Sequence, residues 1–183
     1  MAEPDSKILK IIHYGHPSLR VRCAKVTEFN DELREFADAM FRTMHANAGV
    51  GLAASQVNRL IQLLVIGLPV KDSEEIIHLS VVNPEILEPA GSWEYEEGCL
   101  SIPDIRDNVT RPEKLRLRYQ DLSGKSHEIV ADGLLARVLQ HEIDHLNGVL
   151  FVDHLSPVRR AIHNGKLKRL ARETAEELAA EPR

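Results

Sequence analysis

The sequence has little cysteine, few aromatic residues and no long apolar run. Two cysteines in 183 residues cannot build a disulfide scaffold, and a lone disulfide is not expected without a secretory leader. No apolar stretch approaches the roughly 20 residues that a membrane-spanning helix needs. The net charge of −5 gives no general nucleic-acid signature, and the acidic start of the chain carries no signal or transit pattern. We therefore expect a cytoplasmic protein that binds neither membranes nor DNA.

What is present indicates a globular domain of the α+β class. Hydrophobic residues make up 43% of the chain and charged residues 28%, which is enough for a core in one domain. Asn30 is the expected N-cap of a helix that reaches about residue 47, and a helix that begins after Asp132 is apolar nearly all round. We expect small, mostly antiparallel sheets around this buried central helix, with an N-terminal and a C-terminal helix beside them. The strands are predicted over residues 7–12, 61–67, 79–82, 114–121 and 126–131.

The central helix carries the sequence QHEIDHLNG at residues 140–148. His141 and His145 are four residues apart, so both project from one face of the helix and can hold one metal ion. Glu142 could reach a water on that ion without binding the ion itself, which is the arrangement of hydrolytic metal sites. The same pattern also occurs by chance in unrelated helices. Buried histidine and glutamate cost free energy unless they are bonded, so a metal site is the better interpretation in this apolar helix.

The third metal ligand must come from elsewhere in the chain. One protease pattern needs a further histidine where this chain has Phe151, and another takes a glutamate from a later helix. Glu173 and Glu176 could be proposed for that role, but they lie in a charged tail without an apolar packing face. Cys99 remains. A thiolate with two imidazoles suits Zn²⁺ or Fe²⁺ and leaves a fourth position open for water.

A second unusual stretch, GVGLAASQ, occupies residues 49–56. Two glycines spaced by one residue allow the backbone to approach another group closely. A phosphate-binding loop needs a longer glycine pattern, which is absent. Alone, the stretch is either a tight turn or a loop that lines a substrate cleft.

Together, residues 49–56, the EGCLS stretch at 97–101 and residues 140–148 resemble, in this order, the three motifs of the peptide deformylase family. The resemblance spans about residues 7–155 and indicates the bacterial or organellar type with a C-terminal helix. It departs at Asp104 and Asp107, where many members have glycine. The implied domain arrangement is a catalytic domain over 1–156, extended by a helix over 157–183.

The resemblance implies a hydrolase that removes the formyl group from the N-terminal formylmethionine of newly synthesised polypeptides. Cys99, His141 and His145 would hold the metal, which lowers the pKa of its water from about 16 towards about 7. Glu142 would act as general base and acid, while the Gln56 side-chain amide and the Leu100 backbone N–H would receive the charge on the formyl oxygen. The remaining candidates are Gly49, Val50, Gly51, Leu134 and Val138 for substrate binding, and Glu97, Arg106, Arg111 and Asp144 as supporting polar residues. A structural salt-bridge network is an equally good interpretation of the last four.

The resemblance also implies one Fe²⁺ per chain in the cell, although Zn²⁺ fits the same ligands and Zn²⁺, Ni²⁺ or Co²⁺ could occupy purified protein. Two alternatives stay open: a zinc endopeptidase, which lacks its downstream ligand here, and a protein with structural zinc, which prefers four protein ligands. The last helix, predicted to begin at Ser156-Pro157, carries six basic residues between 159 and 172. They form either a solvated face or a site that docks on ribosomal RNA.

Overall fold

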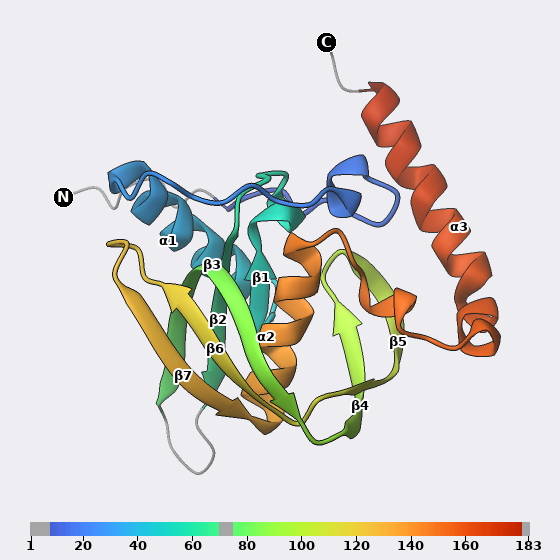
Figure 1. Cartoon of the computed structure of the whole chain (residues 1–183). Coiled ribbons are helices and arrows are strands. Elements are labelled where there is room, and N and C mark those ends of the chain that lie inside the picture. The colour runs from blue at the N-terminus through green and yellow to red at the C-terminus, as the bar shows by residue number, and fades with distance from the viewer. Residues whose placement is uncertain (1–7, 70–74, 181–183) are drawn as a thin grey trace.

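A computed structural model of the chain describes residues 8–69 and 75–180 and has the predicted α+β class (Figure 1). All pairings between its named strands are antiparallel. A five-stranded sheet has the order β1 (Gly51–Ala53), β2 (Leu63–Pro69), β3 (Ile76–Ala90), β6 (Lys114–Gln120) and β7 (Ser126–Asp132). A separate two-stranded sheet consists of β4 (Trp93–Cys99) and β5 (Ile102–Arg111). The helices are α1 (Asp31–Ala46), α2 (Gly133–Leu146) and α3 (Pro157–Ala180), with short 3₁₀ helices η1 (Pro17–Arg20), η2 (Ala54–Val57) and η3 (Phe151–Asp153).

The central helix α2 lies between the two sheets (Figure 1). Its apolar side chains, including Leu139 and Ile143, pack with Leu64 and Ile66 of β2 and with Leu117 of β6. Residues of β2 that alternate with these face the other way and pack against α1, so β2 is buried on both faces. The motif-bearing helix is therefore enclosed in the core, as the sequence predicts.

Both predicted ends of α1 agree with the structure. The Asn30 side chain accepts a hydrogen bond from the Leu33 N–H at 3.0 Å, which satisfies one of the free donors of the first turn. At the other end, the helix stops at Ala46 and the chain turns into the short strand β1. Met40 and Met44 are fully buried on the face of α1 that covers β2.

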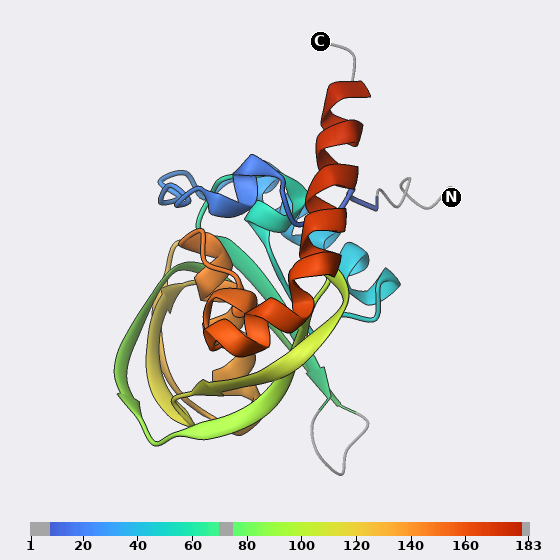
Figure 2. The ribbon, with the colours of Figure 1, turned by 90° about the vertical axis from the view of Figure 1, so that its right-hand side faces the viewer.

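Helix α3 lies at the periphery and extends past the rest of the molecule (Figure 2). Leu167 and Leu170 pack in a cluster with Ile105 and Val109 of β5. Asp107, on the same strand, binds the His163 side chain through its Oδ2 at 2.9 Å and also forms an ion pair with Arg159. The C-terminal helix is thus fastened to β5 by apolar and ionic contacts.

The predicted strands differ from the observed ones in three places. Residues 8–12 form no strand (residue 7 lies outside the described ranges), because their backbone donors bind elsewhere: the Leu9 N–H to the Thr43 Oγ1 at 2.9 Å and the Ile12 N–H to the Gln56 carbonyl of η2 at 2.8 Å. Strand β3 continues past Asn83 to Ala90 through a register shift, with Asn83 at φ 50°. Strands β4 and β5 have no sequence prediction, since β4 is acidic with a glycine near its end and β5 contains a proline and lacks regular alternation.

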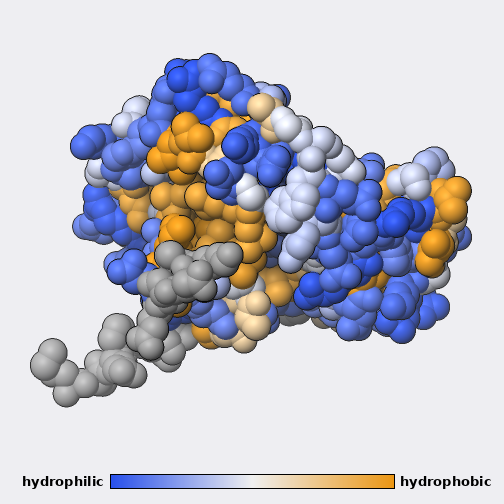
Figure 3. All heavy atoms as spheres, turned by 90° about the horizontal axis from the view of Figure 1, so that it is seen from below, coloured by the Kyte–Doolittle hydropathy of each residue, from blue (hydrophilic) through white to orange (hydrophobic). Residues whose placement is uncertain are grey.

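Apolar side chains gather on the face of the molecule where β7 ends and α2 begins (Figure 3). Val130 and Leu134, close to that junction, are 77% and 44% exposed. Among the described residues, no helix has both the length and the apolar composition for a membrane span.

Candidate metal centre

The structure brings Cys99, His141 and His145 together. One donor atom from each lies within 4.8 Å of the other two, and the Cys99 Sγ is 3.2 Å from Nε2 of His145. The two imidazole rings project from successive turns of α2, with centroids 5.0 Å apart. Cys99 reaches them from the end of β4, where the ladder with β5 changes register. Helix and hairpin therefore supply the three donors jointly.

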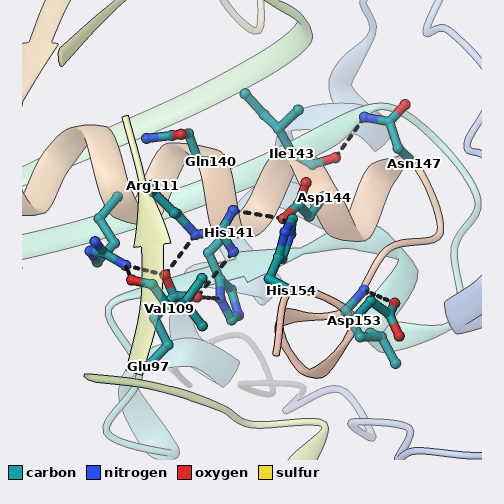
Figure 4. A network of polar contacts seen from close by, with 12 residues as sticks. Glu97, Val109, Arg111, Gln140, His141, Ile143, Asp144, Asn147, Asp153 and His154 are labelled. Carbon is teal, nitrogen blue, oxygen red and sulfur yellow. Dashed lines mark hydrogen bonds and ion pairs between the residues drawn. The ribbon is translucent and has the colours of Figure 1, made fainter. Parts of the chain in front are cut away.

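The Glu97 carboxylate orients one of these rings (Figure 4). Its Oε2 accepts a hydrogen bond from Nδ1 of His141 at 2.9 Å, so the lone pair of Nε2 is left for a ligand. Arg111 donates to both oxygens, at 2.6 Å from Nε and 3.0 Å from Nη2. Burial raises the pKa of Glu97, but the hydrogen bonds from His141 and Arg111 outweigh it and hold that pKa well below its usual value. Glu97 is thus ionised whenever the protein is folded near neutral pH.

A second carboxylate, that of Asp144 on α2, extends this network (Figure 4). Asp144 Oδ2 accepts from Nη1 of Arg111 at 2.7 Å and contacts Nε2 of His154 at 2.7 Å. Burial raises the pKa of Asp144, whereas the bonds from His154 and Arg111 lower it, with a net decrease. Arg111 consequently links the β4–β5 hairpin to α2.

Glu142 lies against the strand that carries the glycine motif. A Cβ atom on Gly51 would clash with the Glu142 carboxylate, so a side chain at this position would displace that carboxylate. Glu142 is 4% exposed, and burial raises its pKa to about 7, a value suited to taking and returning a proton at neutral pH. A cation bound by Cys99, His141 and His145 would lower that pKa again.

The donor set fits a divalent transition metal. Two imidazoles and one thiol are ligands that Zn²⁺ and Fe²⁺ accept, and three ligands leave room for solvent. The Oε2 of Glu142 is buried and has no hydrogen-bond partner among the residues that the structure describes. A water held beside the three ligands would satisfy it.

Gln56 borders the same site from η2. Its Oε1 accepts from the Ala53 N–H at 2.8 Å, which turns the amide nitrogen towards the ligands. That Nε2 lies 3.4 Å from the Cys99 Sγ and 3.3 Å from the Ser101 Oγ. Because Gln56 is 1% exposed and bonded at both ends, its N–H group is held in a fixed direction.

A cavity of about 620 Å³ is lined by Cys99 and His141, two of the three candidate ligands, and by Glu142. Leu100 lines it, and so do all five residues expected to bind substrate: Gly49, Val50, Gly51, Leu134 and Val138. Val50 and Leu134 are 42% and 44% exposed, whereas Val138 is buried, so the first two stand at the mouth of the cavity and the third is deeper. The cavity combines apolar walls with the polar groups of the ligand site.

The structure does not bring Arg106 into the ligand network. Its side chain is 70% exposed, and its nearest carboxylate is that of Glu96, at 3.6 Å. By contrast, Arg137 and Ser101 are buried in the site, and sequence reasoning missed both. The signal for Arg137 was a charged residue inside the otherwise apolar run 134–139, and Ser101 gave none beyond its place in the cysteine motif.

Comparisons with known proteins agree with this geometry. The model of the polypeptide deformylase family matches residues 8–161. A peptide deformylase of Wolinella succinogenes is 47% identical over 90% of this chain and 98% of its own. The crystal structure of a peptide deformylase from Legionella pneumophila superposes with a TM-score of 0.82 at 43% identity, covering 96% of this chain and all of that one. Peptide deformylase 1B of Arabidopsis thaliana, solved with an inhibitor, has a TM-score of 0.86 at 34% identity, covering 92% and 93% of the two chains.

Proposed function

The chain belongs to the polypeptide deformylase family, and we propose that Cys99, His141, His145 and Glu142 carry out its hydrolysis. The protein removes the formyl group from the N-terminal formylmethionine of newly synthesised polypeptides and releases formate. The observation that carries the residue assignment is the convergence of one thiol and two imidazoles beside a buried carboxyl group with no other partner for its Oε2 among the described residues. The family is metal-dependent, in agreement with this cluster.

A divalent metal on the three ligands would supply Lewis acidity, which lowers the pKa of a water from about 16 towards about 7. Glu142 accepts the proton of the attacking water and then donates a proton to the departing amine. As the formyl oxygen gains negative charge, Gln56 Nε2 and the Leu100 backbone N–H donate hydrogen bonds to it. Gly51 lets Glu142 stand close to the strand along which the substrate backbone would lie. Glu97, Arg111 and Asp144 keep His141 oriented.

The methionine side chain would enter the cavity between Val50, Leu134 and Val138. These residues offer apolar contact without a charge, which suits an unbranched thioether side chain. The rest of the nascent chain leaves the cavity past its exposed rim. Gly49 and Gly51 flank that path with backbone instead of side chain.

We propose Fe²⁺ as the metal in the cell, with Zn²⁺, Ni²⁺ or Co²⁺ able to replace it in purified protein. The donor set suits each of these ions, so the ligands alone leave the choice open. Purification without oxygen followed by elemental analysis tests the proposal. Iron in the anaerobic preparation that is lost in air together with activity would support it.

The main alternative function is a zinc endopeptidase. Its remaining ligand candidates, Glu173 and Glu176, are on α3, where they are exposed and paired with Arg169 and Arg172. The decisive assay compares formyl-Met-Ala, acetyl-Met-Ala and an unformylated protein substrate. Formate release from the first alone supports the deformylase; cleavage of internal bonds without formate release would overturn it.

We also propose that residues 157–183 extend the catalytic domain of residues 1–156 and can dock on the ribosome. The apolar and ionic contacts of α3 with β5 support a single domain. Ribosome docking is supported by the exposed side chains of Lys168, Arg169 and Arg172. Because the substrate is a nascent polypeptide, the enzyme must share its compartment, which supports a cytoplasmic location.

A further inference from the structure

Arg137 is a buried cation four residues before His141, on the same face of α2. Its side chain is 3% exposed. The Nη1 donates to the Glu97 Oε1 at 2.6 Å and to the Val109 carbonyl at 3.0 Å, and the Nη2 donates to the Trp93 carbonyl. The guanidinium also lies over the Trp93 ring, 4.8 Å from its centroid. A charged group of this size is buried only where its bonds are numerous and well aligned.

Those bonds join the two elements that supply the ligands. Trp93 begins β4, the strand that ends at Cys99, and Val109 lies on the partner strand β5. Arg137 itself is on α2, which carries His141 and His145. The side chain therefore ties both strands of the hairpin to the helix by hydrogen bonds to their backbone.

Arg111 connects the same two elements in the opposite direction. Arg111 starts on the hairpin and reaches Asp144 on α2, whereas Arg137 starts on α2 and reaches the hairpin. Both guanidinium groups donate to the same oxygen, Oε1 of Glu97, at 2.6 Å each. Glu97 is thereby held from two sides while its other oxygen orients His141.

We propose that Arg137 is a positioning residue, which sets the separation between the Cys99 thiolate and the two imidazoles. The inference rests on the proposed metal centre. Metal–ligand distances tolerate changes of only about 0.2 Å, so a small displacement of the hairpin relative to α2 weakens binding. Removal of the guanidinium leaves the Trp93 and Val109 carbonyls without this donor and leaves Glu97 with Arg111 and His141 alone. Lysine keeps the charge but has no planar fork to reach three acceptors at once.

The test compares the full-length wild type with Arg137→Met, Arg137→Lys and the control Arg118→Met, whose side chain is 51% exposed and pairs on the outer surface. Each protein is stripped of metal and titrated with Co²⁺ against a competing chelator. Absorption of the Co²⁺ form reports thiolate coordination and geometry. We expect Arg137→Met to bind Co²⁺ about 10- to 100-fold more weakly with altered bands, and Arg137→Lys about tenfold more weakly. Arg118→Met should match the wild type.

A lower melting temperature together with wild-type Co²⁺ affinity and spectrum in both Arg137 variants would show that Arg137 only braces the fold, and the proposal would be wrong. If Arg137→Met does not fold, Arg137→Lys decides in the same way. Failure of the wild type to bind Co²⁺ through a thiolate would instead overturn the metal centre itself. The two failures are therefore distinguishable.

Discussion

The chemistry of the site depends on two buried carboxylates with opposite properties, one on strand β4 and the other on helix α2. Glu97 receives bonds from two guanidinium groups and an imidazole, and its pKa is well below the usual value. Glu142 has no such cation bonded to it among the described residues, and burial raises its pKa to about 7. The first therefore serves as a fixed anion, and the second is suited to proton transfer.

The first residue-scale prediction concerns Glu142. Replacement by glutamine preserves the size of the side chain but removes its ability to take and return a proton. We expect Glu142→Gln to lower kcat by about 10²- to 10⁴-fold while the metal content stays at one per chain. Formate release and elemental analysis measure the two quantities. Glu128→Gln, on the outer surface, is the matched control, and a Glu142→Gln enzyme with wild-type turnover would refute the assigned role.

Gln56 allows a separate test of the charge developing on the formyl oxygen. Glu in its place keeps an oxygen that can accept from the Ala53 N–H but removes the donor. We expect Gln56→Glu to reduce kcat by at least about 10²-fold, with substrate binding changed much less. Steady-state kinetics with formyl-Met-Ala separates kcat from KM. A change confined to KM would indicate a role in substrate binding instead.

At the scale of elements, the site depends on the close packing of helices, strands and turns that are separate in the sequence. Strand β1 approaches α2 so closely that Gly51 has no space for a Cβ beside Glu142. Gly148, at φ 75° after the end of α2, would place a Cβ 2.7 Å from the Arg20 carbonyl. Both glycines belong to the sequence motifs, and the structure gives each a steric reason.

We predict that Gly51→Ala displaces the Glu142 carboxylate. The added methyl group would occupy the space of Oε1, so kcat should fall about as far as in Glu142→Gln while metal is retained. Gly165→Ala is the matched control, because its Cβ meets nothing within 4 Å and alanine in a helix stabilises by about 0.5–1 kcal/mol. Formate release, metal content and melting temperature test both variants. Undiminished turnover in Gly51→Ala would contradict the predicted clash.

Asp107 fastens α3 to β5, and its replacement by asparagine should loosen that contact. We expect a loss of about 1 kcal/mol, which lowers the melting temperature by about 2–4 °C at pH 7. Burial raises the pKa of Asp107, but bonds from His163 and the Asn108 N–H lower it, with a net decrease. The stabilisation is therefore complete above the unfolded pKa of about 3.9 and is lost as pH falls through the lower folded value. Thermal melts from pH 7 down to pH 3 measure the melting temperatures of the wild type and of Asp107→Asn. The difference between the two melting temperatures should shrink only at the acidic end of this range.

For the whole molecule, sequence patterns predicted those features that depend on the type and spacing of neighbouring residues. The spacing of His141 and His145 and the scarcity of cysteine indicated three candidate ligands, which the structure brings together, and the apolar surroundings indicated a buried helix. Patterns failed where tertiary contacts decide the outcome. Strands β4 and β5 are held together by the hydrogen bonds between them and by contacts with Arg137. A period-2 sequence pattern reveals neither kind of contact. Residues 8–12 are apolar enough for a strand, yet their backbone donors bind elsewhere.

The charge distribution of α3 decides how the ribosome proposal is best tested. Arg159 and Arg160 pair with Asp107 and Asp153 of the body, and Lys166 donates to the Asp104 carbonyl, so these three are engaged in holding the helix. Deleting the helix would also expose the buried Leu167 and Leu170 and disturb β5. A loss of ribosome binding on truncation would therefore be ambiguous.

A sharper variant replaces the outward basic residues Lys168, Arg169 and Arg172 by glutamine and keeps the buried face of α3. If these side chains contact ribosomal phosphates, cosedimentation should weaken and its dependence on the logarithm of salt concentration should lose about one unit of slope per lost contact. The triple variant Arg34→Gln, Arg42→Gln and Arg118→Gln is the matched control, because it removes three exposed basic side chains outside α3. Equal cosedimentation of the α3 triple variant and the wild type at every salt concentration would mean that this helix is only a brace for β5. Deformylation of a free peptide should be unchanged in either case, because none of the three side chains lines the cavity.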